Sequence, residues 1–126
     1  MLLSLRPTLM EGVYAFCRID GGVLPSSVIS WFREAEGTTV ILPLAEAHSS
    51  RLTVDFEAAW IALGVESSLS AVGLTAVIAA ALAAEGIACN VVAACRHDHL
   101  FVPISRAADA MRVLNQLSSE GSQIGR

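Results

Sequence analysis

The segment from Trp60 to Ile104 constrains the fold of this chain more than any other. Its pattern predicts a strand, a polar loop, a helix rich in small residues, a second strand, a tight turn and a third strand. Ser105 then begins a second amphipathic helix. Such a β-α-β-β-α order with short connections favours an α+β fold in which two helices cover one face of an antiparallel sheet.

The first of these two helices has recognisable start and stop signals. We expect it from about Ala71 to Glu85, with Ser68 or Ser70 as its N-cap, because both hydroxyls can accept a hydrogen bond from the first helical turn. Gly86 is the expected left-handed stop. The second helix is predicted to end near Ser118, and the tail that follows it is predicted to be frayed.

The first half of the chain predicts a smaller lobe. Strands are expected over Gly12–Ile19 and Thr38–Leu44, and a helix from about Pro25 to Glu36 that would place Trp31 and Phe32 in the core or at a subunit interface. A loop over 45–50 is the predicted boundary, so that residues 1–50 form one lobe and 51–126 the other. A long extended run over 51–65 opens the second lobe, with a bend or bulge expected near Glu57–Ala59.

Composition narrows the class of protein. Apolar residues make up 54% of the chain and charged residues only 16%, so we expect part of the surface to be covered by another copy in a homo-oligomer, most simply a dimer. The net charge is -4, and the basic residues are scattered singly, so nucleic-acid binding has no support.

Targeting and redox signals predict a cytoplasmic protein. The N-terminal apolar run is too short for a signal peptide, and Glu85-Gly86 interrupts the apolar segment over 71–94 before it could span a membrane. The three cysteines are Cys17, Cys89 and Cys95, an odd number without CxxC spacing, which favours reduced and mostly buried thiols.

Several separated motifs resemble the ACT domain, in the branch of small stand-alone bacterial proteins with two such lobes. They are SSLSAVGLTA, NVVA and HDHLFVPI in the second half, and LRPTLMEGVYAFCRI and FREAEGTTVIL in the first half. The resemblance covers nearly the whole chain and implies ferredoxin-like (βαββαβ) ACT lobes, two in number, with the N-terminal lobe abbreviated. It also implies a regulatory or sensing role, in which an amino acid or similar effector binds at a lobe or subunit interface, and no catalysis.

The predicted ligand site is the start of the helix after Glu66. Free backbone N–H groups at a helix start can hold a carboxylate, serine hydroxyls can add donors, and a glycine allows close approach. The resemblance supports this site, because the same strand-to-helix loop contacts effectors in the family. It also implies that Asp98, in the HDH turn, accepts a ligand ammonium or guanidinium. The candidate residues are Ser67, Ser68, Leu69, Val72, Gly73, Leu74 and Asp98.

Other interpretations of the same residues remain open. The serine-rich loop can be an ordinary helix cap, and Asp98 an ordinary turn residue. Cys95, His97 and His99 have a spacing that suits Zn²⁺ in an extended strand, but no fourth ligand is placed, so we expect neither a metal nor a cofactor. The alternatives to a sensor are a structural or interaction module with a vestigial pocket, and a small enzyme that uses Cys95 and His97.

Overall fold

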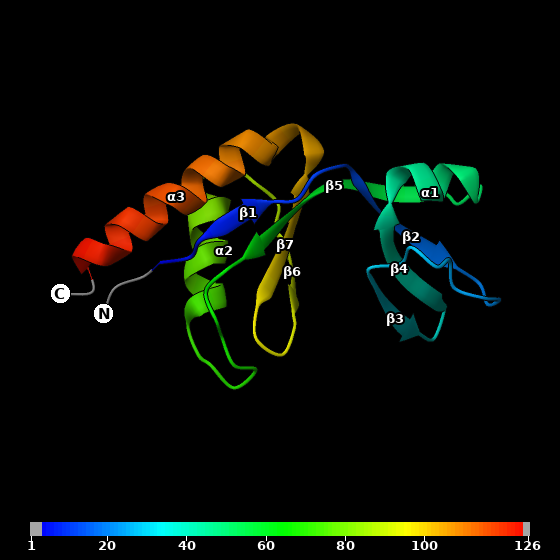
Figure 1. Cartoon of the computed structure of the whole chain (residues 1–126), viewed down its shortest axis with the longest axis horizontal. Helices are drawn as coiled ribbons and strands as arrows, with labels where there is room; N and C mark the ends of the chain where they lie inside the picture. The colour runs from blue at the N-terminus through cyan, green and yellow to red at the C-terminus, as the bar shows by residue number, and fades with distance from the viewer. Residues whose placement is uncertain (1–3, 125–126) are drawn as a thin grey trace. The chain divides into compact units, whose positions relative to one another are not determined.

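A computed structural model describes the backbone of residues 4–124 and the side chains of residues 4–118. The chain forms two compact units (Figure 1). We call Glu11–Ala59 the first lobe, and the described residues up to Met10 together with those from Trp60 onward the second lobe. The boundary predicted at residue 50 lies inside the first lobe, and as a division between functional lobes it stays a prediction.

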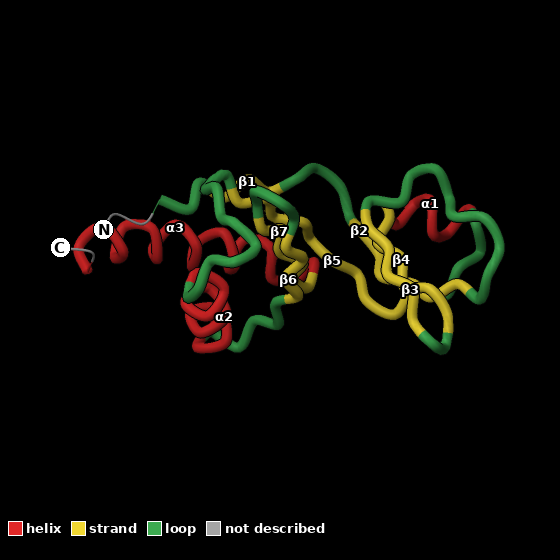
Figure 2. Tube along the Cα trace, turned by 90° about the horizontal axis from the view of Figure 1, so that it is seen from below, coloured by secondary structure: helices red, strands yellow, loops and turns green. Residues whose placement is uncertain are grey.

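The first lobe is a four-stranded antiparallel sheet with a single helix. Its strands are β2 (Tyr14–Ile19), β3 (Ser30–Glu34), β4 (Gly37–Pro43) and the first part of β5 (Val54–Leu63), and its helix is α1 (Leu44–Ser49). The strand order is β3-β4-β2-β5. Loop connects β2 to β3 where a complete βαββαβ lobe has its first helix (Figure 2). The abbreviated first lobe is therefore confirmed.

The helix predicted over 25–36 is wrong, because its second half is strand β3. A two-residue turn, Ala35-Glu36, joins β3 to β4, and Gly37 after it has a φ of +145°. Trp31 and Phe32 point to opposite faces and are 50% and 71% exposed, so neither is a core residue. Their helical spacing carried no information, since a short apolar run does not distinguish helix from strand.

The loop predicted over 45–50 is also wrong, because α1 occupies most of it. Pro43 precedes the helix, where a missing N–H costs nothing, and Ala47 is fully buried against the sheet. The helix ends at Ser49 with Ser50 as its C-cap, Arg51 after the cap has a φ of +57°, and the N–H of Leu52 donates to the carbonyl of Ala47 at 2.9 Å. The core under α1 contains Ala15, Cys17, Val40, Leu42 and Ala47.

Strand β5 belongs to both lobes and carries a bulge. Phe16 pairs with Phe56 and Cys17 with Val54, so Asp55 is the extra residue, whereas the bend was predicted near Glu57–Ala59. The predicted alternation at the end of the strand is confirmed, because Ile61 and Leu63 are buried.

The second lobe has the predicted β-α-β-β-α order. After β5 come α2 (Leu74–Ala84), β6 (Asn90–Ala93), β7 (Asp98–Pro103), a 3₁₀ turn (Ile104–Arg106) and α3 (Ala107–Ile124). Strand β1 (Pro7–Leu9) pairs with β5 and completes the order β1-β5-β7-β6. Helix α3 continues well past Ser118, so the frayed tail is wrong for the described residues. The buried core includes Ile78, Leu82, Leu100, Val102, Ala110 and Leu114.

Helix α2 begins later than predicted. Its first residue is Leu74, and its N-cap is Gly73 with a φ of +105° and no side-chain capping bond. The predicted caps, Ser68 and Ser70, lie before this glycine, and the start at Ala71 is therefore wrong. The predicted stop is confirmed, because Gly86 has a φ of +71° directly after the last turn.

Helix α2 is apolar on its outward face as well as on its buried face. Only Ile78 and Leu82 are fully buried, whereas Ala76, Val77, Ala80 and Ala83 are exposed, and the helix contains no charged residue. A helix that is apolar all round normally has both faces covered. Within the described part of the chain, no helix is long and apolar enough to cross a membrane.

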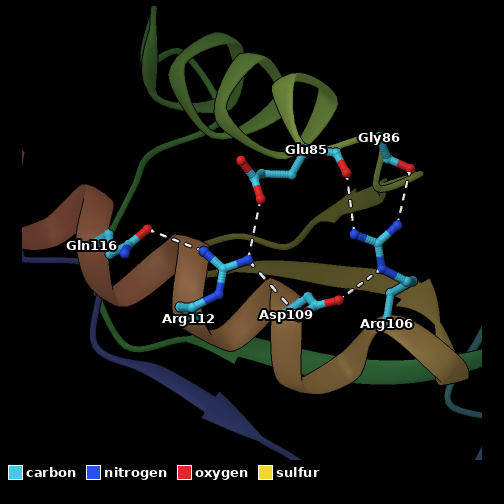
Figure 3. A network of polar contacts seen from close by, with 6 residues as sticks. All are labelled: Glu85, Gly86, Arg106, Asp109, Arg112 and Gln116. Atoms are coloured by element: carbon cyan, nitrogen blue, oxygen red, sulfur yellow. Dashed lines mark hydrogen bonds and ion pairs between the residues drawn. The ribbon is translucent and has the colours of Figure 1, made fainter.

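Two arginines tie the end of α2 to α3 (Figure 3). The Arg106 guanidinium donates to the carbonyl oxygens of Glu85, at 3.1 Å, and Gly86, at 3.5 Å, and Asp109 holds it at 3.0 Å. Arg112 donates to the Glu85 carboxylate at 3.1 Å. Arg106 therefore satisfies the carbonyl groups of the two residues that directly follow α2, and it places a positive charge at the negative end of the helix dipole.

Replacing Arg106 with alanine should lower the free energy of unfolding by about 1–2 kcal/mol, because two carbonyls of the α2 terminus lose a charged donor. The loss of unfolding free energy stays modest because about a third of the Arg106 side chain is exposed (34%), so water screens its charge. Urea unfolding measures the change. Arg106→Lys should recover only part of the loss, since an ammonium cannot span both carbonyls. Wild-type stability in the alanine variant would contradict this role.

Candidate functional site

Two connections of the second lobe meet at one end of its sheet. The loop between β5 and α2 (64–73) follows the end of β5, and the turn between β6 and β7 (94–97) precedes the start of β7. The N–H of Ser67 donates to the carbonyl oxygen of Arg96 at 2.6 Å. Because β5 and β7 are neighbours in the sheet, this bond holds the polar loop against the turn.

An open depression lies between these two connections. Its volume is about 450 Å³, and it is lined by Glu66, Ser67, Ser68, Cys95 and Arg96. The lining therefore combines one acidic group, one basic group and two hydroxyls. Such a set suits a small ligand that carries both charges, since each charge finds an opposite partner.

The start of α2 follows the loop that lines the depression, and Val72 and Gly73 just before it are exposed. The first N–H groups of any α-helix have no partner within the helix, and Gly73 adds no side-chain cap. The loop before it folds on itself, since the N–H of Ala71 donates to the Ser68 carbonyl at 3.0 Å and the Ser68 and Ser70 hydroxyl oxygens lie 3.3 Å apart. A Cβ atom added to Gly73 would have no atom of the described residues within 4 Å, apart from its two chain neighbours.

The predicted site residues fall into three groups in the structure. Ser67 and Ser68 line the depression. Leu69, Val72, Gly73 and Leu74 follow along the loop to the helix start, with Val72 98% exposed. Asp98 is not part of the lining.

Asp98 lies at the start of β7 and is almost buried, at 6% exposed. It lies on the same face of β7 as Leu100 and Val102, both fully buried. Among the described residues, no hydrogen bond or ion pair to its carboxylate is found, and its charge acts on the neighbouring His99. The Asp98 oxygens still reach the surface, because Ser27 Oγ is the one fully buried side-chain polar atom without a partner among the described residues.

Glu66 and Arg96 begin the two segments that sequence reasoning singled out, 66–73 and 96–99, but neither was chosen as a ligand contact. Both adjoin predicted site residues, but a depression between two connections depends on strand pairing that local pattern does not reveal. The sequence signal that could have found them is the pair of opposite charges, with one residue inside each connection.

The three cysteines differ in reactivity. Burial raises the pKa of Cys89 to about 11, and burial together with Asp55 raises the pKa of Cys17. Cys95 is exposed, so the expectation of mostly buried thiols is wrong for it. Because the thiolate is the reactive form, Cys95 is the thiol most open to alkylation.

Among the described residues, His99 of the HDH turn is hydrogen-bonded to Trp60 and not to Cys95. The Nδ1 atom of His99 accepts a hydrogen bond from the Trp60 indole N–H at 3.0 Å. Burial lowers the pKa of His99, and His97 lowers it further, whereas the charge of Asp98 acts in the opposite direction. Within residues 4–118, no cluster of three or more His, Cys, Asp or Glu side chains could hold a metal, and no hydrogen bond joins Cys95 to His97.

Two family models match the chain in tandem. Both describe an ACT domain, one over residues 1–59 and the other over residues 55–116. None of the curated proteins matches the chain significantly.

Solved structures agree with these matches. A Vibrio cholerae protein of unknown function, described as a possible transport protein, is 42% identical over 90% of this chain and 88% of its own, with a TM-score of 0.83. An Agrobacterium tumefaciens protein is 17% identical over 90% of this chain and 89% of its own (TM-score 0.71). The ligand-free regulatory subunit of aspartate kinase from Thermus thermophilus is 12% identical over 93% of this chain and 98% of its own (TM-score 0.65), a likeness of fold alone.

Proposed function

This chain belongs to the ACT domain family, as a protein with two ACT domains in tandem, and on that premise we propose that it senses a free amino acid. ACT domains are regulatory, non-catalytic modules that commonly bind small ligands and form oligomers. The single observation that supports the proposal is a depression with one acidic and one basic group, lined by the loop that leads into the start of α2, where no side chain caps the helix.

The chemistry of the site supports a zwitterion. The ligand carboxylate would bind the first N–H groups of α2, between Val72 and Leu74, with the hydroxyls of Ser67 and Ser68 or the Arg96 guanidinium as further donors. Glu66 would accept the α-ammonium group. Gly73 favours close approach, because a Cβ at this position would stand between the ligand and the helix start.

Asp98 is the proposed acceptor for a second, side-chain cation of the ligand. Its carboxylate follows the turn that holds Arg96 and has no partner among the described residues, so a ligand amine or guanidinium would satisfy it. Because Asp98 does not line the depression, this contact requires the loop over 64–73 to move when the ligand enters. The proposal therefore favours a basic amino acid.

Ligand binding would regulate the association of subunits. Helix α2 starts at the proposed site, and its outward face is apolar and uncovered, so we place a homodimer interface on Ala76, Ala80 and Ala83. A ligand that contacts the start of α2 shifts the monomer–dimer equilibrium by its difference in affinity for the two states. We also propose a cytoplasmic location, which suits an exposed free thiol such as Cys95.

A screen of the standard amino acids at millimolar concentration tests the proposal. A ligand at 100 times its Kd should raise the free energy of unfolding by about 2.7 kcal/mol, a rise of several degrees in Tm. The same ligand should slow alkylation of Cys95, which lines the depression, while the thiols with raised pKa values stay largely unlabelled. Cys95→Ser is the control for the labelled position.

Two analogues of any stabilising amino acid test which of its groups contact the site. Removal of its α-carboxylate or of its α-ammonium group should abolish both the stabilisation and the protection of Cys95. Absence of any stabilising amino acid would favour an interaction module with a vestigial pocket. Stabilisation without protection of Cys95 would place the ligand elsewhere on the chain.

A further inference from the structure

A tryptophan and a histidine join β5 to β7 on one face of the second lobe. The Trp60 indole N–H donates to Nδ1 of His99 at 3.0 Å, and the two rings are tilted by 55° with their centroids 5.7 Å apart. Trp60 also stacks on Phe101, with a centroid distance of 6.0 Å and an interplanar angle of 22°. Phe101 is only 1% exposed, although it lies on the face of β7 opposite Leu100 and Val102. The hydrogen bond therefore holds the indole where it stacks on Phe101.

This hydrogen bond fixes the protonation state of His99. An indole N–H only donates, so Nδ1 must accept, and the neutral imidazole carries its proton on Nε2. A second proton would occupy Nδ1 itself and bring two N–H groups head to head. The imidazolium would also meet the edge of the indole, which carries the positive part of the ring quadrupole, so no cation–π attraction replaces the lost bond. Neutral His99 is therefore the form that holds Trp60.

The strands beside His99 bring neutral side chains against it. On β6, Val92 lies directly opposite His99, and on β5 the next residue on the face of the indole is Ala62. Within residues 4–118, the charges that act on His99 are those of His97 and Asp98 in its own turn, and they act in opposite directions. Burial is the largest influence, and it favours the neutral ring.

We propose that Trp60 and His99 form an acid-sensitive latch between β5 and β7, closed when His99 is neutral and open when His99 is protonated. Because the pKa of His99 lies below its usual value of 6.5, the latch opens at a pH below 6.5. Its contribution to the free energy of unfolding is therefore complete above about pH 6.5, and it is lost as the pH falls through the pKa of the folded protein.

The latch joins the two strands that carry the connections around the depression. The loop over 64–73 continues from β5, and the turn over 94–97 leads into β7. An open latch is expected to weaken ligand binding there, an effect that rests on the proposed function. One neutral hydrogen bond can transmit a loss of at most about 10-fold in affinity. By linkage, a bound ligand should lower the pKa of His99 to the same extent.

Nuclear magnetic resonance of the indole N–H group tests the latch in the whole chain. The chain has two tryptophans, so Trp31→Phe leaves Trp60 as the source of a single indole resonance. As the pH is lowered from about 8 to about 5, this resonance should move from its hydrogen-bonded to its free position, together with the titration of the His99 Cε1–H resonance. The far-ultraviolet circular dichroism should stay constant. An indole resonance that does not follow His99, or loss of secondary structure at the same midpoint, would overturn the proposal.

Matched substitutions assign the transition to His99. In His99→Asn the amide oxygen can replace Nδ1 as acceptor but does not titrate, so the Trp60 resonance should stay at one position. His97→Asn is the control and should keep the transition at a higher midpoint, because the charge of His97 lowers the pKa of His99. A transition that persists in His99→Asn would contradict the latch.

Trp60→Phe tests the same bond if the His99 variant misfolds. It keeps an aromatic ring but removes the N–H donor, so the midpoint of His99 should rise by about 0.4–1 pH unit, the equivalent of one neutral hydrogen bond. An unchanged midpoint would show that the bond does not favour neutral His99, and would overturn the proposal.

Calorimetry with lysine and arginine separates the latch from the proposed function. Below the transition the affinity of the wild type for a basic amino acid should fall by up to about 10-fold more than that of His99→Asn. The same pH dependence in both proteins would overturn the link between the latch and the ligand site. Absence of binding by any amino acid, with the indole transition intact, would contradict the sensor and leave the latch in place.

Discussion

Replacing Ala80 with glutamate is expected to convert the proposed homodimer to a monomer. Ala80 lies on the outward face of α2, directly opposite the buried Ile78 and Leu82, so the substitution should leave the core intact. In a dimer each new carboxylate would be buried near its symmetry-related copy without a partner, and burial of an unpaired charge is among the costliest changes in an interface. We expect the dimer Kd to rise at least 100-fold, measured by sedimentation equilibrium.

A matched substitution separates an interface effect from a general effect of charge. Ala108 is an exposed alanine of α3 outside the proposed interface, and Ala108→Glu adds the same charge near a helix start, where it is tolerated. This variant should remain dimeric. Dimerisation of the Ala80→Glu protein with wild-type affinity would remove α2 from the interface, and with it the proposed route from ligand to output.

The parts of the fold that local sequence could predict are those whose own side chains decide them. Gly86 stops α2 because its left-handed backbone suits no other residue as well, and alternation along β5 placed Ile61 and Leu63 in the core. Helix α3 was also predictable, since its buried residues recur at helical spacing along one face.

The errors occurred where distant partners decide the structure. Strand β3 forms because β4 pairs with it, and no pattern inside the segment from Pro25 to Glu36 reveals that partner. The start of α2 was placed too early because serine is a strong N-cap in isolation, whereas here Gly73 makes the turn into the helix.

The candidate site could likewise be predicted only where local residues decide it. Ser67 and Ser68 were predicted from their own chemistry, and they line the depression. Glu66 and Arg96 come together only because a hydrogen bond joins the two connections, which sequence alone does not show. Asp98 was expected in an open turn, but it is the first residue of β7 and faces the interior. That difference changes what Asp98 should contribute.

Asp98→Asn is expected to weaken binding of a basic amino acid by about 1.5–3 kcal/mol, or roughly 10- to 150-fold in Kd, measured by calorimetry. The amide keeps the shape of the carboxylate but not its charge, so a charge-assisted hydrogen bond to the ligand cation is lost. Without ligand the same variant should stay within about 0.5 kcal/mol of wild-type stability, because the Asp98 carboxylate makes no hydrogen bond or ion pair among the described residues and its oxygens reach the surface.

Glu66→Gln provides the contrast that assigns each carboxylate. Glu66 lines the open depression and is proposed to bind the α-ammonium group that all amino acids share, so its loss should weaken basic and neutral ligands alike. Asp98→Asn should weaken only ligands with a cationic side chain, since Asp98 lies outside the lining and is proposed to contact the ligand side chain alone. Equal losses for both ligand classes in the Asp98 variant would mean that it acts on the shape of the loop and not on the ligand. An unchanged Kd would remove Asp98 from the site and leave the charge pair of Glu66 and Arg96 to define the ligand.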